Sequence, residues 1–335
     1  MWAASFVLSL AQWYHVVLLF GNDSLKMIFQ AEQGVLDGYP HWRLVQSRVL
    51  GPWLEELLRV LFGFRLSQAH VIIAVAILTL SGVVMFQAGR AIAERQGGWS
   101  ALLAFHALFA LLLSPPWLYI WDYFVLLAAA VFMLLVIRRA PWWSFLLLMS
   151  VAFFNHESAL FIGVWMVAQG VTAAWAKSRR PDWGMVVGGL LGSLGGSLLI
   201  EYLRRSLLKG EIGWGFGLNY QAEPYYFFLR LFSNLSDIQA RMMHPNLGLP
   251  GWLGMMHPNS SFLFAMLPLV WALALAVILI VRHGIEAAPL SIYAVTQVAA
   301  LLLFAIIWEL RDYLQLVPFL CLGGMLAAKP DWETT

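Results

Sequence analysis

Residues 141–176 read PWWSFLLLMSVAFFNHESALFIGVWMVAQGVTAAWA, an apolar stretch interrupted by Asn155, His156 and Glu157. As one helix, its roughly 36 residues would measure about 54 Å at about 1.5 Å per residue. The hydrocarbon core of a bilayer is only about 30 Å thick. Basic residues stand just outside both ends of the stretch, which is typical of cytoplasmic connections. The stretch therefore predicts two short spans that meet at the polar triplet, on the opposite side of the membrane.

The composition of the whole chain indicates an integral membrane protein. Hydrophobic residues make up 61% of the 335 residues, charged residues make up 11%, and the mean hydropathy is +0.76. Soluble domains contain about 25% charged residues. The net charge of +2 is too small to indicate nucleic-acid binding. The single cysteine, Cys321, excludes an intramolecular disulfide framework and a site made of several thiolates.

We expect an all-α polytopic protein with a single transmembrane domain, residues 1–335, and about ten transmembrane helices (range about 8 to 11). The candidate spans are residues 2–20, 68–89, 99–114, 117–137, 142–155, 158–176, 183–200, 262–281, 289–307 and 312–328. Alternate short connections carry the basic residues Arg90, Arg95, Arg138, Arg139, Lys177, Arg179, Arg180, Arg282 and Lys329. The positive-inside rule places these connections and the N-terminus in the cytoplasm.

Three segments outside the spans have predicted roles. The first outward loop, residues 21–67, is expected to contain two short helices lying at the membrane interface, at 25–36 and 52–64. The long outward loop 201–261 either forms a lid or covers the ends of the spans. In the seventh span, glycines recur at every fourth position from Gly184 to Gly196, a pattern typical of close helix packing.

Unusual polar residues gather in the outward segments. Asp23 is the first acidic residue after the first span, and Arg48 opens the run RVLGPWL. The triplet Asn155-His156-Glu157 forms a second group. The stretch WELRDYLQLVPFL supplies Glu309, Arg311 and Pro318. Ionisable residues at helix ends often only mark the interface, but several at one membrane edge favour an outward-facing functional site.

These motifs, in their order along the chain, resemble those of the C-type glycosyltransferase superfamily. An acidic residue just after the first span is matched by Asp23, and an Arg-Val/Ile-Leu-x-Pro-x-Leu run is matched by residues 48–54. An Asn-Arg-Glu-Thr-Ala-Leu-like stretch is matched by residues 155–160, with His156 where arginine is common. A Glu-x-Arg pattern followed by proline is matched by Glu309, Arg311 and Pro318.

The resemblance implies an enzyme that moves a sugar from a polyprenyl-phosphate donor to a glycan, lipid or protein acceptor, with inversion. It implies a bacterial inner membrane protein whose site faces the periplasm. Asp23 would be the general base, with Asp37 the next candidate. The donor phosphate would be bound by Arg48, Arg311 and His156. Substrate-binding or orienting roles would fall to Glu157, Asn155, Glu309 and Asp37. Because no second acid accompanies Asp23, a tightly held divalent metal is not expected.

Three other functions remain open. A transporter would place its site near the bilayer midplane and often contains inverted repeats, and no repeat of span size is visible. A lipid-linked glycan polymerase or ligase would work in a similar setting with a different fold. A non-catalytic scaffold predicts that removing the Asp23 carboxylate has no biochemical effect.

Overall fold

The protein is all-helical. The computed structural model describes residues 1–41, 43–113, 118–176, 180–210, 231–236, 238, 260–305 and 310–329. Within these ranges regular secondary structure is helical and no strand occurs. The all-α prediction is therefore confirmed for the described part of the chain.

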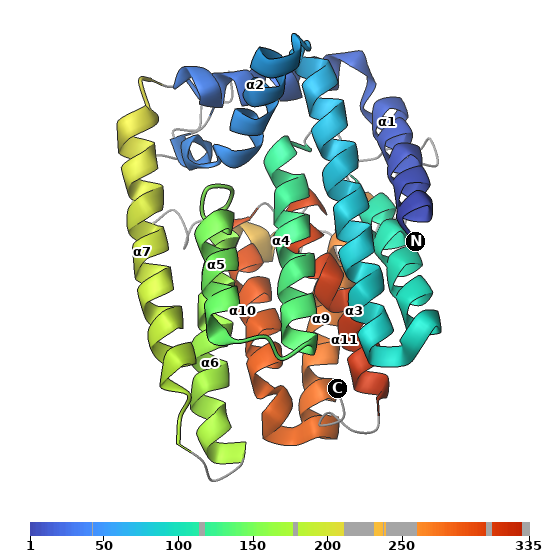
Figure 1. The fold of residues 1–335 in the computed structure, drawn as a ribbon, viewed down its shortest axis with the longest axis vertical. Coiled ribbons are helices and arrows are strands. Elements are labelled where there is room, and N and C mark those ends of the chain that lie inside the picture. The colour runs from blue at the N-terminus through green and yellow to red at the C-terminus, as the bar shows by residue number, and fades with distance from the viewer. Residues whose placement is uncertain are drawn as a thin grey trace.

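Most helices run along the long axis of a bundle, as Figure 1 shows. The α-helices are α1 (Trp2–Asp37), α2 (Leu50–Phe62), α3 (Leu66–Leu111), α4 (Ile120–Ile137), α5 (Trp142–Ala152), α6 (Leu160–Ala176), α7 (Trp183–Leu207), α9 (Ser260–His283), α10 (Ala288–Phe304) and α11 (Val317–Ala328). In the part of the chain that the structure describes, four short 3-10 helices lie between them: η1 (Arg43–Ser47), η2 (Glu157–Ala159), η4 (Gly284–Ala287) and η5 (Leu310–Leu316).

Two long helices change direction within their bounds. In α3 the backbone leaves helical geometry at Ala93 and Glu94, and Glu94 adopts a positive φ of 50°. The bend folds the two limbs of α3 back against each other. The rings of Phe86, before the bend, and Trp99, after it, are 5.3 Å apart. In α1 the bend is at Gly21, whose φ of 66° lies in the region that glycine adopts without a steric penalty.

Six described segments are long and apolar enough to cross a membrane. They are Trp2–Asp37, Leu66–Leu111, Ile120–Ile137, Glu157–Trp175, Trp183–Leu207 and Met266–Phe304. Six is fewer than the predicted ten for two reasons. The second and last segments each contain two predicted spans, separated by the α3 bend and by η4. The 11 residues of α5 and the 12 of α11 measure only about 17–18 Å at about 1.5 Å per residue.

The stretch 141–176 forms two helices, as predicted. Helix α5 ends at Ala152, a turn and η2 follow, and α6 begins at Leu160. The polar triplet therefore lies at a turn between two helices. At the end of the chain, Pro318 was predicted inside a helix that begins at residue 312. The structure instead has η5 there and places Pro318 in the first turn of α11, where its missing N–H costs no helical hydrogen bond.

Residues 22–62, which we call the capping layer, lie across one end of the bundle (Figure 1). The layer consists of α1 after its bend, η1 and α2, so both helices predicted in the first outward loop are confirmed as helices. Gln46 Nε2 donates to the carbonyl of Val35 at 2.9 Å within the layer. The amide of Leu50 donates to the carbonyl of Phe154 at 2.9 Å, which joins the layer to the turn between α5 and α6.

The predicted loop 201–261 is only partly described. Helix α7 extends through the first residues of this range, to Leu207. Asn234, in the helical stretch 231–236, donates to the carbonyls of Leu302 and Ala305 at 2.8 and 2.9 Å. Most of the remaining loop, and with it the predicted lid, lies outside the described residues.

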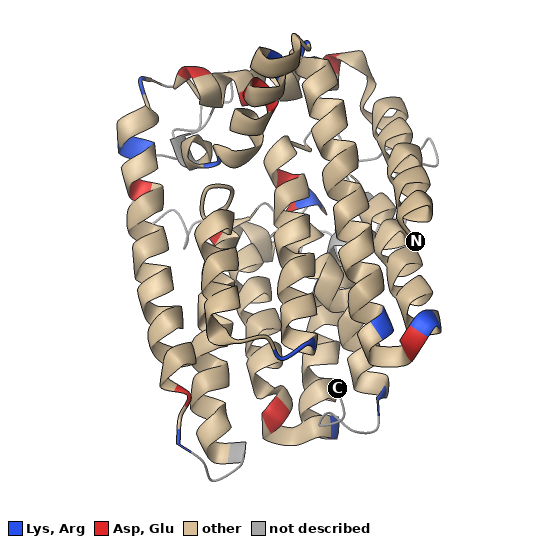
Figure 2. Ribbon diagram, viewed as in Figure 1, with Lys and Arg blue, Asp and Glu red and all other residues tan. Residues whose placement is uncertain are grey.

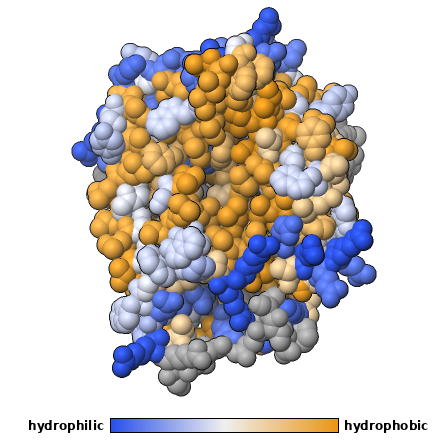
Figure 3. Space-filling model, in the orientation of Figure 1, coloured by the Kyte–Doolittle hydropathy of each residue, from blue (hydrophilic) through white to orange (hydrophobic). Residues whose placement is uncertain are grey.

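Charged residues concentrate toward the two ends of the bundle, and few lie between (Figure 2). On the visible face, the surface between the ends is mainly hydrophobic (Figure 3). The basic residues Arg282 and Lys329 share the end opposite the capping layer, where Arg282 Nη1 donates to the carbonyl of Ala327 at 2.8 Å. This arrangement is typical of a protein that places an apolar girdle in the bilayer.

The glycine ridge of α7 packs against α5 and the residue that ends it, which confirms the predicted packing role. A Cβ at Gly184 or Gly188 would meet Trp142, and one at Gly192 would meet Leu146 and Met149. A Cβ at Gly196 would overlap the ring of Phe153. The ridge therefore lets α7 approach α5 more closely than side chains would permit.

We expect Gly196→Ala to destabilise the protein by about 1–3 kcal/mol, the usual cost of inserting a methyl group into a packed interior. Gly195→Ala is the matched control, because nothing lies within 4 Å of a Cβ at Gly195. Thermal unfolding of both variants in detergent micelles measures the difference. Equal transition temperatures would show that α5 and α7 are not in close contact at this position.

Candidate functional site

A polar site lies beneath the capping layer, where four segments of the bundle meet. The capping layer contributes Arg48, the start of α4 contributes Asp122, and the turn between α5 and α6 contributes Glu157. The end of α7 contributes Arg204 and η5 contributes Arg311. We call Arg48, Arg204 and Arg311 the arginine cluster.

Glu157 binds two members of the arginine cluster. Its Oε2 accepts from Arg48 Nη2 at 3.3 Å, and its Oε1 accepts from Arg204 Nη2. The side chains are 27% exposed for Glu157 and 15% exposed for each arginine. One partly accessible carboxylate therefore holds two guanidinium groups whose residues are 156 positions apart, counted from 48 to 204.

Two stacked aromatic rings support the arginine cluster. The rings of Tyr119 and Trp121 lie 4.4 Å apart, with an interplanar angle of 24°. Arg311 lies over the Tyr119 ring at 4.9 Å and Arg48 lies over the Trp121 ring at 5.9 Å. Such cation–π contacts fix the position of a guanidinium group while leaving its N–H donors at the edge.

Asp122 links this aromatic pair to Arg311. Its Oδ2 accepts the backbone N–H of Tyr119 at 2.8 Å, which caps the first turn of α4. The same oxygen lies 3.5 Å from Arg311 Nη1, and both side chains are buried, at 8% and 7% exposure. The pair is thus an ionic contact removed from water.

His156 is neutral near pH 7. Burial and then the charge of Arg48 lower the pKa of His156 to about 3, and Arg311 and Arg204 act in the same direction. Its Nδ1 accepts the backbone N–H of Ser158 at 3.0 Å, so the ring proton is on Nε2. The predicted contact of His156 with a phosphate stays a prediction, and in the neutral form that contact is a hydrogen bond donated by Nε2–H.

His41, in the capping layer, lies near the same charges. Burial, followed by Arg311 and Arg48, lowers the pKa of His41 to about 3. Its Nε2 is 3.3 Å from the hydroxyl of Tyr119, and the two rings stack at 5.4 Å. Burial and the charges of Arg48 and Arg311 therefore lower the pKa of both histidines, His41 in the capping layer and His156 in the turn between α5 and α6.

A small cavity lies beside His156, and three side-chain amides contribute to its otherwise mainly apolar lining. Its lining includes Asn155, Tyr293, Gln297 and Gln315. Asn155 Nδ2 donates to the carbonyl of Trp121 at 2.8 Å, while its Oδ1 has no hydrogen-bond partner although it is buried. Gln315 Oε1 is also buried without a partner. These oxygens can accept hydrogen bonds from hydroxyl groups of a ligand.

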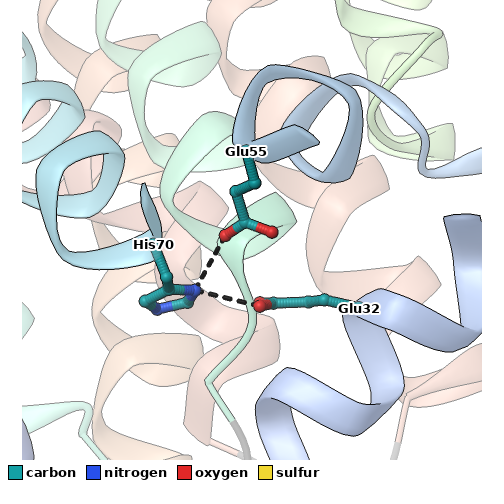
Figure 4. A group of neighbouring side chains, drawn as sticks. All are labelled: Glu32, Glu55 and His70. Atoms are coloured by element: carbon teal, nitrogen blue, oxygen red, sulfur yellow. Dashed lines mark hydrogen bonds and ion pairs between the residues drawn. The ribbon is translucent and has the colours of Figure 1, made fainter. Parts of the chain in front are cut away.

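A second group of ionisable residues lies next to this site, and the sequence analysis did not predict it. Glu32 of α1, Glu55 of α2 and His70 of α3 point toward one another, as Figure 4 shows. Burial, and then the charge of Glu32, raises the pKa of Glu55 to about 8. The backbone N–H of Ile120 donates to Glu32 at 2.7 Å, so the first turn of α4 contacts both groups.

The structure brings together five of the predicted site residues and separates two. Arg48, Arg311, Asn155, His156 and Glu157 all belong to the site described above.

The two separated residues are Asp23 and Asp37. The Asp23 side chain is 97% exposed and contacts Lys26 at 3.6 Å. Asp37 is exposed and accepts from Gln33 at 3.0 Å. Glu309 lies outside the described residues.

The residues that the sequence analysis missed had partial signals. Asp122 and His70 are ionisable groups within apolar stretches, and such residues are by default candidates for function. Arg204 lies one turn beyond the predicted end of its span, so it was not counted among the polar groups of the outward side. Glu32 and Glu55 resemble ordinary charges of amphipathic helices, and only the fold buries both at 0% exposure.

Comparisons of this chain with protein-family models, with curated proteins and with solved structures found no match.

Proposed function

We propose that the protein is a membrane glycosyltransferase that transfers a sugar from a polyprenyl-phosphate donor to a glycan, lipid or protein acceptor. The observation that carries this proposal is the arginine cluster, held on stacked aromatic rings beneath the capping layer and next to the small cavity beside His156. A polyprenyl-phosphate sugar needs a phosphate-binding site, a site for the sugar and an apolar surface for its prenyl chain.

The donor phosphate binds at the arginine cluster. Guanidinium groups present forked donors that match phosphate oxygens. The Nε of Arg48 is buried without a hydrogen-bond partner, so at least one donor of the cluster is available. The Nε2–H of neutral His156 adds a donor without adding charge.

We place the sugar at the mouth of the cavity next to the phosphate, because the cavity itself, of about 20 Å³, has room for about one water molecule. A water bound there can link the unpartnered oxygens of Asn155 and Gln315 to the sugar hydroxyls, which removes the cost of burying these oxygens unsatisfied. The prenyl chain lies against the hydrophobic surface of the bundle. We place about ten spans across a bacterial inner membrane, with the capping layer on the periplasmic side. The segments that contain Arg138, Arg282 and Lys329 are basic, as cytoplasmic segments usually are.

Glu157 is the general base of the proposed reaction, in place of Asp23. It lies at the arginine cluster and is 27% exposed, so an acceptor hydroxyl can reach it. A bound phosphate offsets the guanidinium charges that otherwise stabilise the ionised carboxylate, so donor binding makes Glu157 a better proton acceptor. The phosphate of the donor is itself a good leaving group, and the reaction needs no separate general acid.

We expect Arg48→Lys to weaken binding of a polyprenyl phosphate about 5- to 150-fold, which corresponds to about 1–3 kcal/mol for a hydrogen bond to a charged group. Lysine retains the charge but loses the fork and the stacking on Trp121. Affinity for the donor lipid in nanodiscs measures the effect. The matched control is Arg59→Lys on α2, which lies outside the site and pairs with Glu56 at 2.8 Å. Equal affinities in all three proteins would contradict the phosphate site.

A further inference from the structure

The buried group Glu32, Glu55 and His70 has an unusual charge balance. The side chains of both glutamates are 0% exposed and that of His70 is 1% exposed. Ionised carboxylates at such positions must be paired or must coordinate a metal, because an unpaired buried charge is very costly. One imidazolium neutralises only one of two carboxylates, so the group requires either an additional proton or a cation.

We propose that Glu32, Glu55 and His70 form a binding site for a divalent metal cation that takes mixed nitrogen and oxygen ligands, such as Mn²⁺. This inference goes beyond the proposed glycosyltransferase activity and does not depend on it. The three residues offer one ligand atom each, and these atoms lie within 4.8 Å of one another.

The distances within the group fit an octahedral ion. His70 Nδ1 lies 3.0 Å from Glu32 Oε2 and 2.9 Å from Glu55 Oε1. At metal–ligand distances of about 2.1 Å, neighbouring ligands of an octahedral ion are about 3.0 Å apart. In a tetrahedral site with similar bond lengths they would be about 3.3–3.4 Å apart. The distances from His70 Nδ1 to the two carboxylate oxygens therefore match neighbouring positions of an octahedron, and carboxylate oxygens favour Mn²⁺ over softer ions.

Two buried polar atoms beside the three ligand atoms have no partner of their own. Glu55 Oε2 is buried without a hydrogen bond. The hydroxyl of Tyr123 is also buried without one, its side chain is fully enclosed, and its ring meets that of His70 edge-on at 6.3 Å. A cation coordinated by Glu55 neutralises the carboxylate to which the unpartnered Oε2 belongs, and a metal-bound water is the kind of partner that the Tyr123 hydroxyl lacks.

Neighbouring groups hold Glu32 and His70 in the orientation that a metal ion would need. Glu32 Oε1 accepts the backbone N–H of Ile120 at 2.7 Å, which leaves Oε2 directed at His70. The His70 ring is enclosed by the rings of Trp13 and Phe29, at 5.4 and 5.2 Å. Such contacts fix ligand orientation and exclude solvent. Because the three ligands come from α1, α2 and α3, the ion would fasten the capping layer to the bundle.

The test is metal content and metal-dependent stability of the full-length protein in detergent. We expect one equivalent of Mn²⁺ per chain after incubation with Mn²⁺ and removal of excess ion. The thermal transition should rise with Mn²⁺ concentration and fall on treatment with a chelator, because a ligand that binds only the folded state stabilises it. Glu55→Gln should lower the affinity at least about 100-fold, the upper range for changes in the outer shell.

The matched control is Glu56→Gln, which changes the next residue on α2, a carboxylate whose side chain is 44% exposed. It should bind Mn²⁺ as the unmodified protein does. Electron paramagnetic resonance of the unmodified protein reports the ligands without any substitution, so the proposal remains testable even where Glu55→Gln does not fold. Two outcomes overturn it: no stoichiometric Mn²⁺ and no shift of the thermal transition, or equal Mn²⁺ affinity in Glu55→Gln and Glu56→Gln.

Discussion

Glu157→Gln should lower the rate of sugar transfer by about 10²- to 10⁴-fold, the usual share of general-base catalysis. Glutamine retains the size of glutamate but does not accept a proton. It also removes the negative charge beside Arg48 and Arg204, so the donor phosphate should bind at least as tightly as before. The expected signature is a lowered kcat with an unchanged or lowered KM, which differs from the loss of a binding contact.

Asp23→Asn is the comparison that decides between the two candidate bases. The Asp23 side chain is 97% exposed and its ionic contact is Lys26, so the change should leave transfer nearly unaffected. Both variants are assayed with the same lipid donor and acceptor, together with their thermal stability. A large loss in Asp23→Asn with normal turnover in Glu157→Gln would restore the assignment made from the sequence and contradict the one made from the structure.

Replacing Arg311 with methionine should destabilise the protein by about 3–5 kcal/mol, because it leaves the carboxylate of Asp122 buried without its ionic partner. Both side chains are less than 10% exposed. Asp122→Asn alone should also destabilise the protein, although asparagine can still cap the first turn of α4. The double variant should recover much of the loss, since well-packed neutral groups often replace a buried ion pair without a penalty.

Equilibrium unfolding in mixed micelles measures this double-mutant cycle. Lys26→Met is the control, because the Lys26 side chain is 72% exposed and its pairing with Asp23 should contribute little. Additive effects of Arg311→Met and Asp122→Asn would mean that the two residues stabilise the protein independently. The contact between η5 and α4 would then have no electrostatic component.

The positions of the helices could be predicted because bilayer-length apolar runs leave few alternatives. The predicted span 183–200 lies within α7, and the predicted span 262–281 lies within α9. The bend at Gly21 falls at the predicted boundary between the first span, residues 2–20, and the outward loop that begins at residue 21. The η5 segment before α11 was not foreseen, because hydropathy does not report the type of helix within an apolar run.

The site was predictable where its residues are polar interruptions of apolar sequence, as at the triplet beginning with Asn155. It was not predictable where burial is created by tertiary packing. Glu32 and Glu55 lie on helices that appear amphipathic in sequence, and the bend at Gly21 turns one of them onto the bundle. Asp23 was selected by its sequence position after the first span, which gave no information about its 97% exposure.

The first turn of α4 has a thermodynamic consequence. Adjacent backbone amides, those of Tyr119 and Ile120, donate to Asp122 and to Glu32. Tyr119 is the N-cap and Ile120 the first residue of α4, a helix start where N–H groups lack intrahelical acceptors and favour negative charge. The proposed anion site and the proposed cation site therefore share the start of one helix, and a shift of this helix start would change both. If filling one site moves the turn, the affinity of the other site changes, and reciprocity requires that the two effects be equal in free energy.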